Sequence, residues 1–305
     1  MAKVQPKIAG AGICCLDYIV ASPRVPWGDT AFVTDFQVQG GGLVATALVA
    51  CARLGAECGL FSLLGDDQIG EQIVAELVAE GVDCAGVPRI PGGASPFSFV
   101  HVDDSSGDRT IFHRSGAGLR SGTSLVEFPR EMDYQAAVVD EVYPELALAA
   151  AKLCREKAIP VVADLIPSPG GEELLRYVDV LIAPRHYARE IGRENDLDGA
   201  LDAIHALGPK IAVITLGADG WVYSDGTDSG RGEAFAVDVV DTTGAGDTFH
   251  GAFAYGLALG WTTRRCCEFA SAVAAIKCTK PGGRTGLPSL PQAMDFLKER
   301  SKLEW

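Results

Sequence analysis

The chain has 305 residues, of which 48% are apolar and 22% charged, and its formal net charge is −14. This composition is typical of a soluble globular protein with a sizeable core. The acidic charge disfavours nonspecific binding to nucleic acid or to an anionic membrane, because both need a basic surface. No apolar run approaches the roughly 20 residues of a membrane span, and the start lacks the apolar stretch of a signal peptide, so we expect a cytoplasmic protein.

The nine cysteines are odd in number and lie mostly inside apolar stretches, such as Ile13-Cys14-Cys15-Leu16. This placement predicts reduced core residues rather than a disulfide framework. No Cys/His spacing matches a zinc site.

Apolar, β-branched runs alternate with amphipathic stretches along most of the chain. The pattern predicts strands over 7–13, 58–63, 136–140, 160–164, 178–182 and 211–215, and helices over 44–54, 70–80 and between the later strands. Because strands and helices alternate, we expect an α/β fold in which helices cover both faces of a mostly parallel sheet. No long linker or internal repeat divides the chain, so we expect one domain over 1–305.

Two segments, 19–39 and 96–114, interrupt this pattern because they look extended and contain no helix. In the second segment, a turn-rich stretch over 103–108 separates two short strands, which is a hairpin signature. We expect a small projecting sheet built from about 15–39 and 96–114. Projecting strands leave edges that need covering, which predicts a lid over a substrate or the contact of a homodimer.

The strongest local motif is Asp241-Thr242-Thr243-Gly244-Ala245-Gly246-Asp247-Thr248-Phe249, followed by a helical pattern. A Gly244-Ala245-Gly246 turn that opens a helix leaves backbone N–H groups free, and the helix dipole adds to their attraction for an anion. Asp247 then stands in the first turn, where its carboxylate could take a proton from a bound hydroxyl. The alternative is an ordinary capped helix in which Asp247 complements the dipole.

This motif resembles the C-terminal signature of the PfkB, or ribokinase-like, carbohydrate kinase family. Gln39-Gly40-Gly41-Gly42 at the start of a helix and Gly65-Asp66-Asp67-Gln68-Ile69-Gly70 after it resemble the family's N-terminal signature. The resemblance implies a three-layer α/β/α sandwich with a β-sheet lid. It also implies ATP-dependent phosphorylation of a sugar hydroxyl, with Mg²⁺ as cofactor and Asp247 as base.

The same resemblance assigns further site residues. It places Asp17, Gly41, Gly42 and Thr46 at the sugar, and Arg109 of the lid hairpin near the active site, where it could clamp phosphate or equally be a surface charge. It places Thr215, Gly217, Asp219 and Gly220 in the nucleotide loop and Cys278 beside the adenine pocket. It also implies that Asp241 and Thr243 hold a monovalent cation such as K⁺.

Two departures from the family pattern bear on the metal and the substrate. The family's Asn-x-x-Glu motif, which organises Mg²⁺, has no Asn in Ala183-Pro184-Arg185-His186, and Glu190 is the one candidate to substitute through water. Leu43, Val44 and Thr46 stand where several sugar kinases carry Asn or Lys, so the hydroxyls that are read should differ. The region 235–286 looks most similar to ketohexokinase and sulfofructose kinase members, which slightly favours a ketose-like substrate.

Three alternatives stay open at this point. Trp27, Phe97, Phe99 and Phe112 could stack on the base of a nucleoside, or could pack in the core or a dimer contact. A catalytically silent, sugar-binding regulatory relative is also compatible with the missing Asn-x-x-Glu motif. Lys280 and Arg284 either contact phosphate or belong to a solvated loop.

Overall fold

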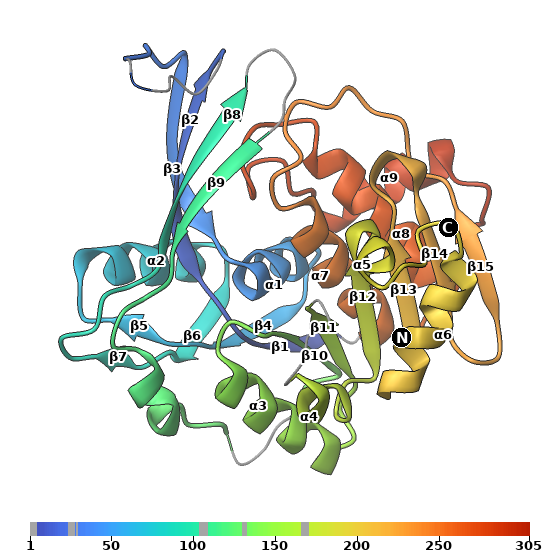
Figure 1. Ribbon diagram of the computed structural model, residues 1–305, viewed down its shortest axis with the longest axis horizontal. Coiled ribbons are helices and arrows are strands. Elements are labelled where there is room, and N and C mark those ends of the chain that lie inside the picture. Colours follow the sequence, from blue (N-terminus) through green and yellow to red (C-terminus); the bar gives the residue numbers. More distant parts are fainter. Residues whose placement is uncertain (1–4, 24–27, 29, 104–108, 130–132, 166–170) are drawn as a thin grey trace.

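A nine-stranded sheet forms the centre of the computed structural model, which describes residues 5–23, 28, 30–103, 109–129, 133–165 and 171–305. The strand order is β15-β14-β13-β12-β11-β10-β1-β4-β6 (Figure 1). Its strands are β1 (Lys7–Ala11), β4 (Glu57–Phe61), β6 (Val82–Gly86), β10 (Ala136–Asp140), β11 (Val161–Asp164), β12 (Val180–Pro184), β13 (Ile211–Thr215), β14 (Trp221–Ser224) and β15 (Ser229–Gly232). All neighbours from β6 to β13 are parallel, whereas β14 and β15 add antiparallel pairs at one edge.

Helices cover both faces of this sheet, as predicted. One face carries α1 (Leu43–Arg53), α2 (Gln68–Ala79), α7 (Ala245–Ala258), α8 (Thr263–Lys277) and α9 (Leu290–Arg300); the other carries α3 (Pro144–Glu156), α4 (Glu172–Leu175), α5 (Arg185–Glu190) and α6 (Leu197–Leu207). Val138 and Val162 point into the first layer, and their neighbours Ala137 and Ala163 point into the second. This alternation of buried side chains is why the strands read as continuous apolar runs.

The lid is a separate four-stranded sheet with the order β3-β2-β8-β9, which projects from the main body in Figure 1. It consists of β2 (Cys15–Ser22), β3 (Asp35–Gly41), β8 (Phe97–Asp103) and β9 (Arg109–Arg114). β8 and β9 form the predicted antiparallel hairpin, and β2 joins the two segments by pairing parallel to β8. The short pair β5 (Leu64–Gly65) and β7 (Arg89–Ile90) and the 3₁₀ helices η1 (Arg120–Leu125) and η2 (Gly217–Asp219) complete the regular structure of the described residues.

The strand expected over 7–13 ends at Ala11, and the chain turns at Gly12 before the lid strand β2 begins. The helix expected over 70–80 begins two residues earlier, because Asp67 caps it by accepting a hydrogen bond from the Gly70 N–H at 2.9 Å. None of the helices in the described ranges is long and apolar enough to cross a membrane.

All nine cysteines are free, and eight of them are buried. The ninth, Cys84, is partly exposed on β6. The prediction that the cysteines lie in the core therefore agrees with the structure for eight of the nine.

Candidate active site

Two carboxylates mark the edge of the sheet where the parallel strands end. Asp140 closes β10 and Asp164 closes β11, and the two are register partners. The N-terminus of α7 lies against these strand ends, since His250 of α7 contacts both Asp164 and the Ile182 carbonyl of β12. Open α/β sheets bind ligands at this carboxyl edge.

The turn before α7 has the form of an anion cradle. Its N-cap, Gly244, has φ 72°, and a Cβ there would lie 2.9 Å from the Gly283 carbonyl oxygen, so glycine is required. The Ala245 N–H donates to the Thr242 carbonyl at 3.2 Å, whereas the N–H groups of Gly246 and Asp247 have no acceptor among the described residues. A Cβ at Gly246 would meet nothing within 4 Å. At the positive end of the helix, these two donors are therefore left without a protein acceptor among the described residues.

The surroundings of Asp247 raise the pKa of its carboxyl group. Burial raises the pKa of its carboxyl to about 7, and the charges of Asp164 and Asp17 add to the effect, while His250 and Arg109 oppose it. A carboxyl group with a pKa near neutrality is suited to general base catalysis.

His250 and Asp164 are two site residues that the sequence reasoning missed. His250 Nδ1 lies 2.8 Å from the Gly246 carbonyl and 3.3 Å from Asp164 Oδ2, and its Nε2 lies 3.0 Å from the Ile182 carbonyl. Asp164 is the last residue of a predicted strand, and strand ends of a parallel sheet are where functional carboxylates gather. The position of Asp164 in the sequence could therefore have identified it as a site residue. No local sequence pattern identifies His250 in this way.

On the lid, Asp17 of β2 lies close enough to Asp247 for its charge to raise the pKa of that carboxyl. Its side chain is buried, and burial raises the pKa of its carboxyl, while hydrogen bonds from Cys15 and Ser98 act in the opposite direction. Gly41 lies against it, because a Cβ at Gly41 would come within 2.1 Å of Asp17 Oδ2.

Ser98 is the register partner of Asp17, and His113 is in turn the register partner of Ser98; sequence reasoning did not single them out. Ser98 Oγ and His113 Nδ1 lie 3.2 Å apart. The lid face that carries Asp17 therefore presents hydroxyl, imidazole and carboxylate groups, all of which hydrogen-bond to polyols.

Two residues predicted at the sugar have structural positions at the start of α1. Gly42 is the N-cap of this helix. Thr46 is 1% exposed, and its hydroxyl accepts a hydrogen bond from Arg284 Nε at 3.3 Å, so it does not reach the surface of the site.

Arg284 differs from both of its predicted roles. Its side chain is 3% exposed and bonds to the base of the lid, so it neither contacts phosphate nor lies in a solvated loop. Lys280 of the same loop is exposed.

Arg109 lies close to the cradle. Its Nη1 donates to Thr242 Oγ1 at 2.5 Å, across a separation of 133 residues. The contact joins the lid hairpin to the motif before α7, and the positive charge of Arg109 lowers the pKa of Asp247.

The predicted nucleotide loop follows β13. Thr215 ends this strand, Gly217 is the first residue of η2, and Gly220 caps the end of η2. Asp219 forms an exposed ion pair with Arg185 Nη2 at 2.5 Å.

Cys278 lies at the end of α8, and its thiol is buried. Its carbonyl accepts the N–H groups of Val240 at 2.8 Å and Asp241 at 3.2 Å. Val239 and Val240 are exposed, 59% and 49%, so an apolar surface that the sequence reasoning missed adjoins Cys278. Such a surface suits a flat heterocycle.

Asp241 and Thr243 are buried beneath the cradle. The carboxylate of Asp241 accepts the N–H groups of Thr243 at 2.8 Å and Gly282 at 2.7 Å, and these bonds hold its pKa below the usual value despite burial. The Lys277 ammonium donates to the Asp241 carbonyl at 2.9 Å. An ionised carboxylate and a hydroxyl of this kind suit a hard cation, although part of the charge is already balanced by Lys277.

Glu190 ends α5 and is exposed. The described ranges contain no group of three or more His, Cys, Asp or Glu side chains that could hold a metal ion by themselves.

The lid aromatics lie on the face opposite Asp17. Tyr18 contacts Phe97 edge-to-face and Phe99 at a tilt, with ring centroids 6.1 and 5.3 Å apart, and Phe112 is the cross-strand partner of Phe99. Because successive residues of a strand point to opposite faces, these rings are not positioned to stack on a substrate at Asp17. Trp27 lies outside the described residues.

A three-layer α/β fold with a β-sheet lid, a helix-opening anion cradle and a carboxylate in its first turn define an ATP-dependent sugar kinase. The chain belongs to the pfkB family of carbohydrate kinases, whose family model matches residues 5–290. It is 30% identical to the ribokinases of Bacillus subtilis, covering 94% of this chain and 97% of the relative, and Lactococcus lactis, covering 96% and 97%. The structure of Arabidopsis thaliana ribokinase complexed with ribose and ATP matches with a TM-score of 0.82 at 25% identity, covering 97% of this chain and 99% of that one. Since these relatives are ribokinases, they do not support the expected preference for a ketose.

Proposed function

We propose that the protein transfers the γ-phosphoryl group of ATP to a primary hydroxyl of a neutral sugar bound between Asp17 and Asp247. The observation that carries the proposal is the combination of Asp247, with its pKa near 7, and the two free N–H groups of the cradle. The carboxylate takes the hydroxyl proton while the N–H groups stabilise charge on the transferred group.

Arg109 closes the site from the lid side. Its guanidinium at Thr242 lies beside the cradle, where it adds positive charge for the phosphoryl group. A lid held in this way also excludes water, which limits wasteful hydrolysis of ATP.

Mg²⁺ belongs to the proposal because ATP phosphates need charge neutralisation during transfer. The carboxylate of Asp164, next to Asp247, is better placed to meet such an ion than the exposed Glu190. A monovalent cation beside Asp241 and Thr243 is also proposed, and replacing K⁺ in the assay with tetramethylammonium should lower kcat if that site is used.

The charges at the site favour a neutral sugar. The site contains the carboxyl groups of Asp17, Asp164 and Asp247. Among the arginines, Arg109 contributes a positive charge that lowers the pKa of Asp247. A carboxylate or phosphate on the substrate would meet repulsion there. The ribokinase relatives make D-ribose the first sugar to test, ahead of D-fructose.

The test combines a substrate panel with one substitution. D-ribose, D-fructose, 2-dehydro-3-deoxygluconate and adenosine are compared by coupled detection of ADP, and the neutral sugars should be turned over fastest. Asp247→Asn should then lower kcat by about 10²–10⁴, the usual contribution of a general base, while ATP binding measured by calorimetry stays intact. Undiminished turnover in this variant would refute the mechanism.

The position of the lid aromatics argues against a nucleoside kinase, because the described rings lie on the far side of the lid from Asp17. A catalytically silent relative is disfavoured by the cradle and by Asp247. Faster turnover of adenosine than of any sugar would favour a nucleoside kinase. The absence of ADP release with every compound of the panel would favour a catalytically silent relative.

We further propose that the whole chain acts as one kinase domain and that it forms a homodimer through the outer lid face, defined by Phe36, Val38, Phe99 and Phe112. These side chains are 37–55% exposed and are linked by register through β2 and β8. In a single copy of the chain, these apolar side chains are exposed to water. The same sheet face of a second copy would bury them.

A further inference from the structure

Arg284 is the most deeply buried arginine of the described chain and has no part in the chemistry above. Its side chain is 3% exposed, yet it lies in the loop between α8 and α9. Buried guanidinium groups are costly unless their donors are satisfied, so its partners indicate what it holds in place.

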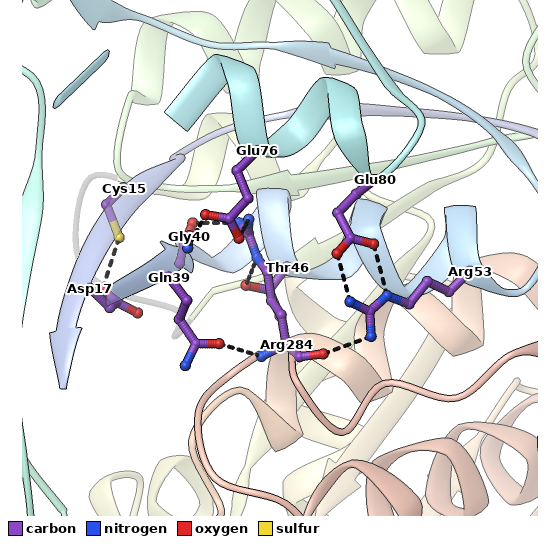
Figure 2. A network of polar contacts seen from close by, with 10 residues as sticks. Cys15, Asp17, Gln39, Gly40, Thr46, Arg53, Glu76, Glu80 and Arg284 are labelled. Atoms are coloured by element: carbon purple, nitrogen blue, oxygen red, sulfur yellow. Dashed lines mark hydrogen bonds and ion pairs between the residues drawn. The ribbon is translucent and has the colours of Figure 1, made fainter. Parts of the chain in front are cut away.

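The partners of the guanidinium are at the base of the lid (Figure 2). Nη2 donates to the Gly41 carbonyl at 2.8 Å, and Nε donates to Thr46 Oγ1 at 3.3 Å. Nη1 lies 3.4 Å from Glu76 Oε1, and the other oxygen of Glu76 accepts the Gly40 N–H at 2.5 Å. The glutamate therefore holds the N–H of Gly40, and the arginine holds the carbonyl of Gly41.

Neither glycine leaves room for a side chain, because other atoms lie directly against both. A Cβ at Gly40 would lie 2.0 Å from Arg284 Nη1, and one at Gly41 would lie 2.1 Å from Asp17 Oδ2. Arg284, the glycine pair and the Asp17 carboxylate are thus stacked in direct contact. The glycine pair is therefore the contact through which the guanidinium reaches Asp17.

The backbone of the same loop is held at the other end of the site. The Gly282 N–H donates to Asp241 Oδ2 at 2.7 Å, and the Gly283 carbonyl lies against the N-cap Gly244 of the cradle. The Arg284 N–H donates to Gln39 Oε1 at 3.1 Å, and Arg53 Nη1 binds the Arg284 carbonyl at 2.9 Å (Figure 2). Three consecutive residues therefore bridge the anion cradle and the lid strand β3.

We propose that Arg284 is a positioning residue, which fixes the Gly40-Gly41 peptides and thereby sets the sugar hydroxyls held by Asp17 at the correct distance from Asp247 and the cradle. It acts through its neighbours and touches neither the sugar nor the phosphate. This inference rests on the proposed sugar kinase function. It assigns to the loop after α8 a role in sugar positioning in addition to any contact with nucleotide.

The test is Arg284→Lys, with Arg265→Lys as the matched control. A lysine ammonium cannot serve Gly41, Thr46 and Glu76 together as the planar guanidinium does. Arg265 is also partly buried, but it stacks on Trp261 and Trp305 away from the site. Kinetic constants are measured for the sugar from the panel that the unmodified protein uses best and for ATP, together with the ratio of ADP to phosphorylated sugar.

For Arg284→Lys, we expect KM for the sugar to rise about tenfold or more, KM for ATP to stay within threefold, and more than one ADP to form per phosphorylated sugar. Arg265→Lys should leave all three values unchanged even where it lowers Tm. A fall in Tm without a change in sugar KM would show that Arg284 is only a structural brace, and an equal rise in KM for ATP would show that it acts on the nucleotide. Either result overturns the proposal.

Glu76→Gln provides a second measurement if Arg284→Lys does not fold. It preserves side-chain volume on α2 and weakens the hold on Gly40, so a smaller rise in sugar KM, about threefold, is expected. An unchanged sugar KM in this folded variant also overturns the proposal. If no sugar is turned over by the unmodified protein, the proposed function fails first, and the two failures are thereby distinguished.

Discussion

The substitution Gly246→Ala separates what the fold needs from what the reaction needs. A Cβ at this position would meet no protein atom within 4 Å, and its φ is not in the left-handed region. Replacing a helical glycine of this kind with alanine stabilises a protein by about 0.5–1 kcal/mol, which is roughly 1–3 °C in Tm for a chain of this size. The folded protein therefore gains stability from the methyl group.

The same methyl group would stand in the open mouth of the cradle, next to the free N–H groups of Gly246 and Asp247. If the transferred phosphoryl group binds there, the methyl group denies it close approach. Losing one donor of an oxyanion-type site costs about 10²–10³ in kcat. We therefore expect a variant with raised Tm in differential scanning fluorimetry and kcat lowered at least a hundredfold in the coupled ADP assay.

Gly244→Ala is the companion variant, because its φ of 72° and the Gly283 carbonyl 2.9 Å from a Cβ make alanine strained. It should lose stability and activity together. A Gly246→Ala enzyme with kcat and ATP KM within threefold of the unmodified protein would refute the assignment of the cradle as the phosphoryl site.

Three further predictions concern the base and the lid. The kcat/KM for sugar should fall about tenfold per pH unit below pH about 7, because the raised pKa of Asp247 keeps its proton until the pH exceeds that value; initial rates that stay flat from pH 8.5 to 5.5 would contradict this. Asp164→Asn removes a charge that raises the pKa of Asp247, so the acid limb should move to lower pH, and an unmoved limb would show that the two carboxyls do not interact. Phe99→Glu places a charge in the outer lid face and should yield a monomer in light scattering where the unmodified protein is a dimer; a variant that stays dimeric excludes this face as the contact.

The parts of the molecule that the sequence predicted are contiguous ones. The cradle from Gly244 to Asp247 is a single turn, so its geometry depends on neighbours in the chain and on the helix that follows. The strands ending at Asp140 and Thr215 were predicted to the residue, because buried parallel strands are uninterrupted apolar runs bounded by polar residues.

The parts that could not be predicted depend on contacts between distant segments. Arg284 and Gly41 are 243 residues apart, and no local pattern shows that a basic loop residue turns inward to the lid. Similarly, the side of the lid on which Phe99 lies depends on the register between β2 and β8, which the hydrophobic pattern of either strand leaves open.

The nine free cysteines have a practical consequence for measuring the stability of the variants discussed above. Burial raises the pKa of the Cys14 thiol to about 11, and it raises the pKa of the partly exposed Cys84 to about 12. Few thiolates therefore exist near neutral pH in the folded chain. Alkylation should therefore proceed mainly through molecules that have opened. A brief pulse of iodoacetamide followed by mass spectrometry would report how often each layer of the protein unfolds, with the nine native cysteines as the probes.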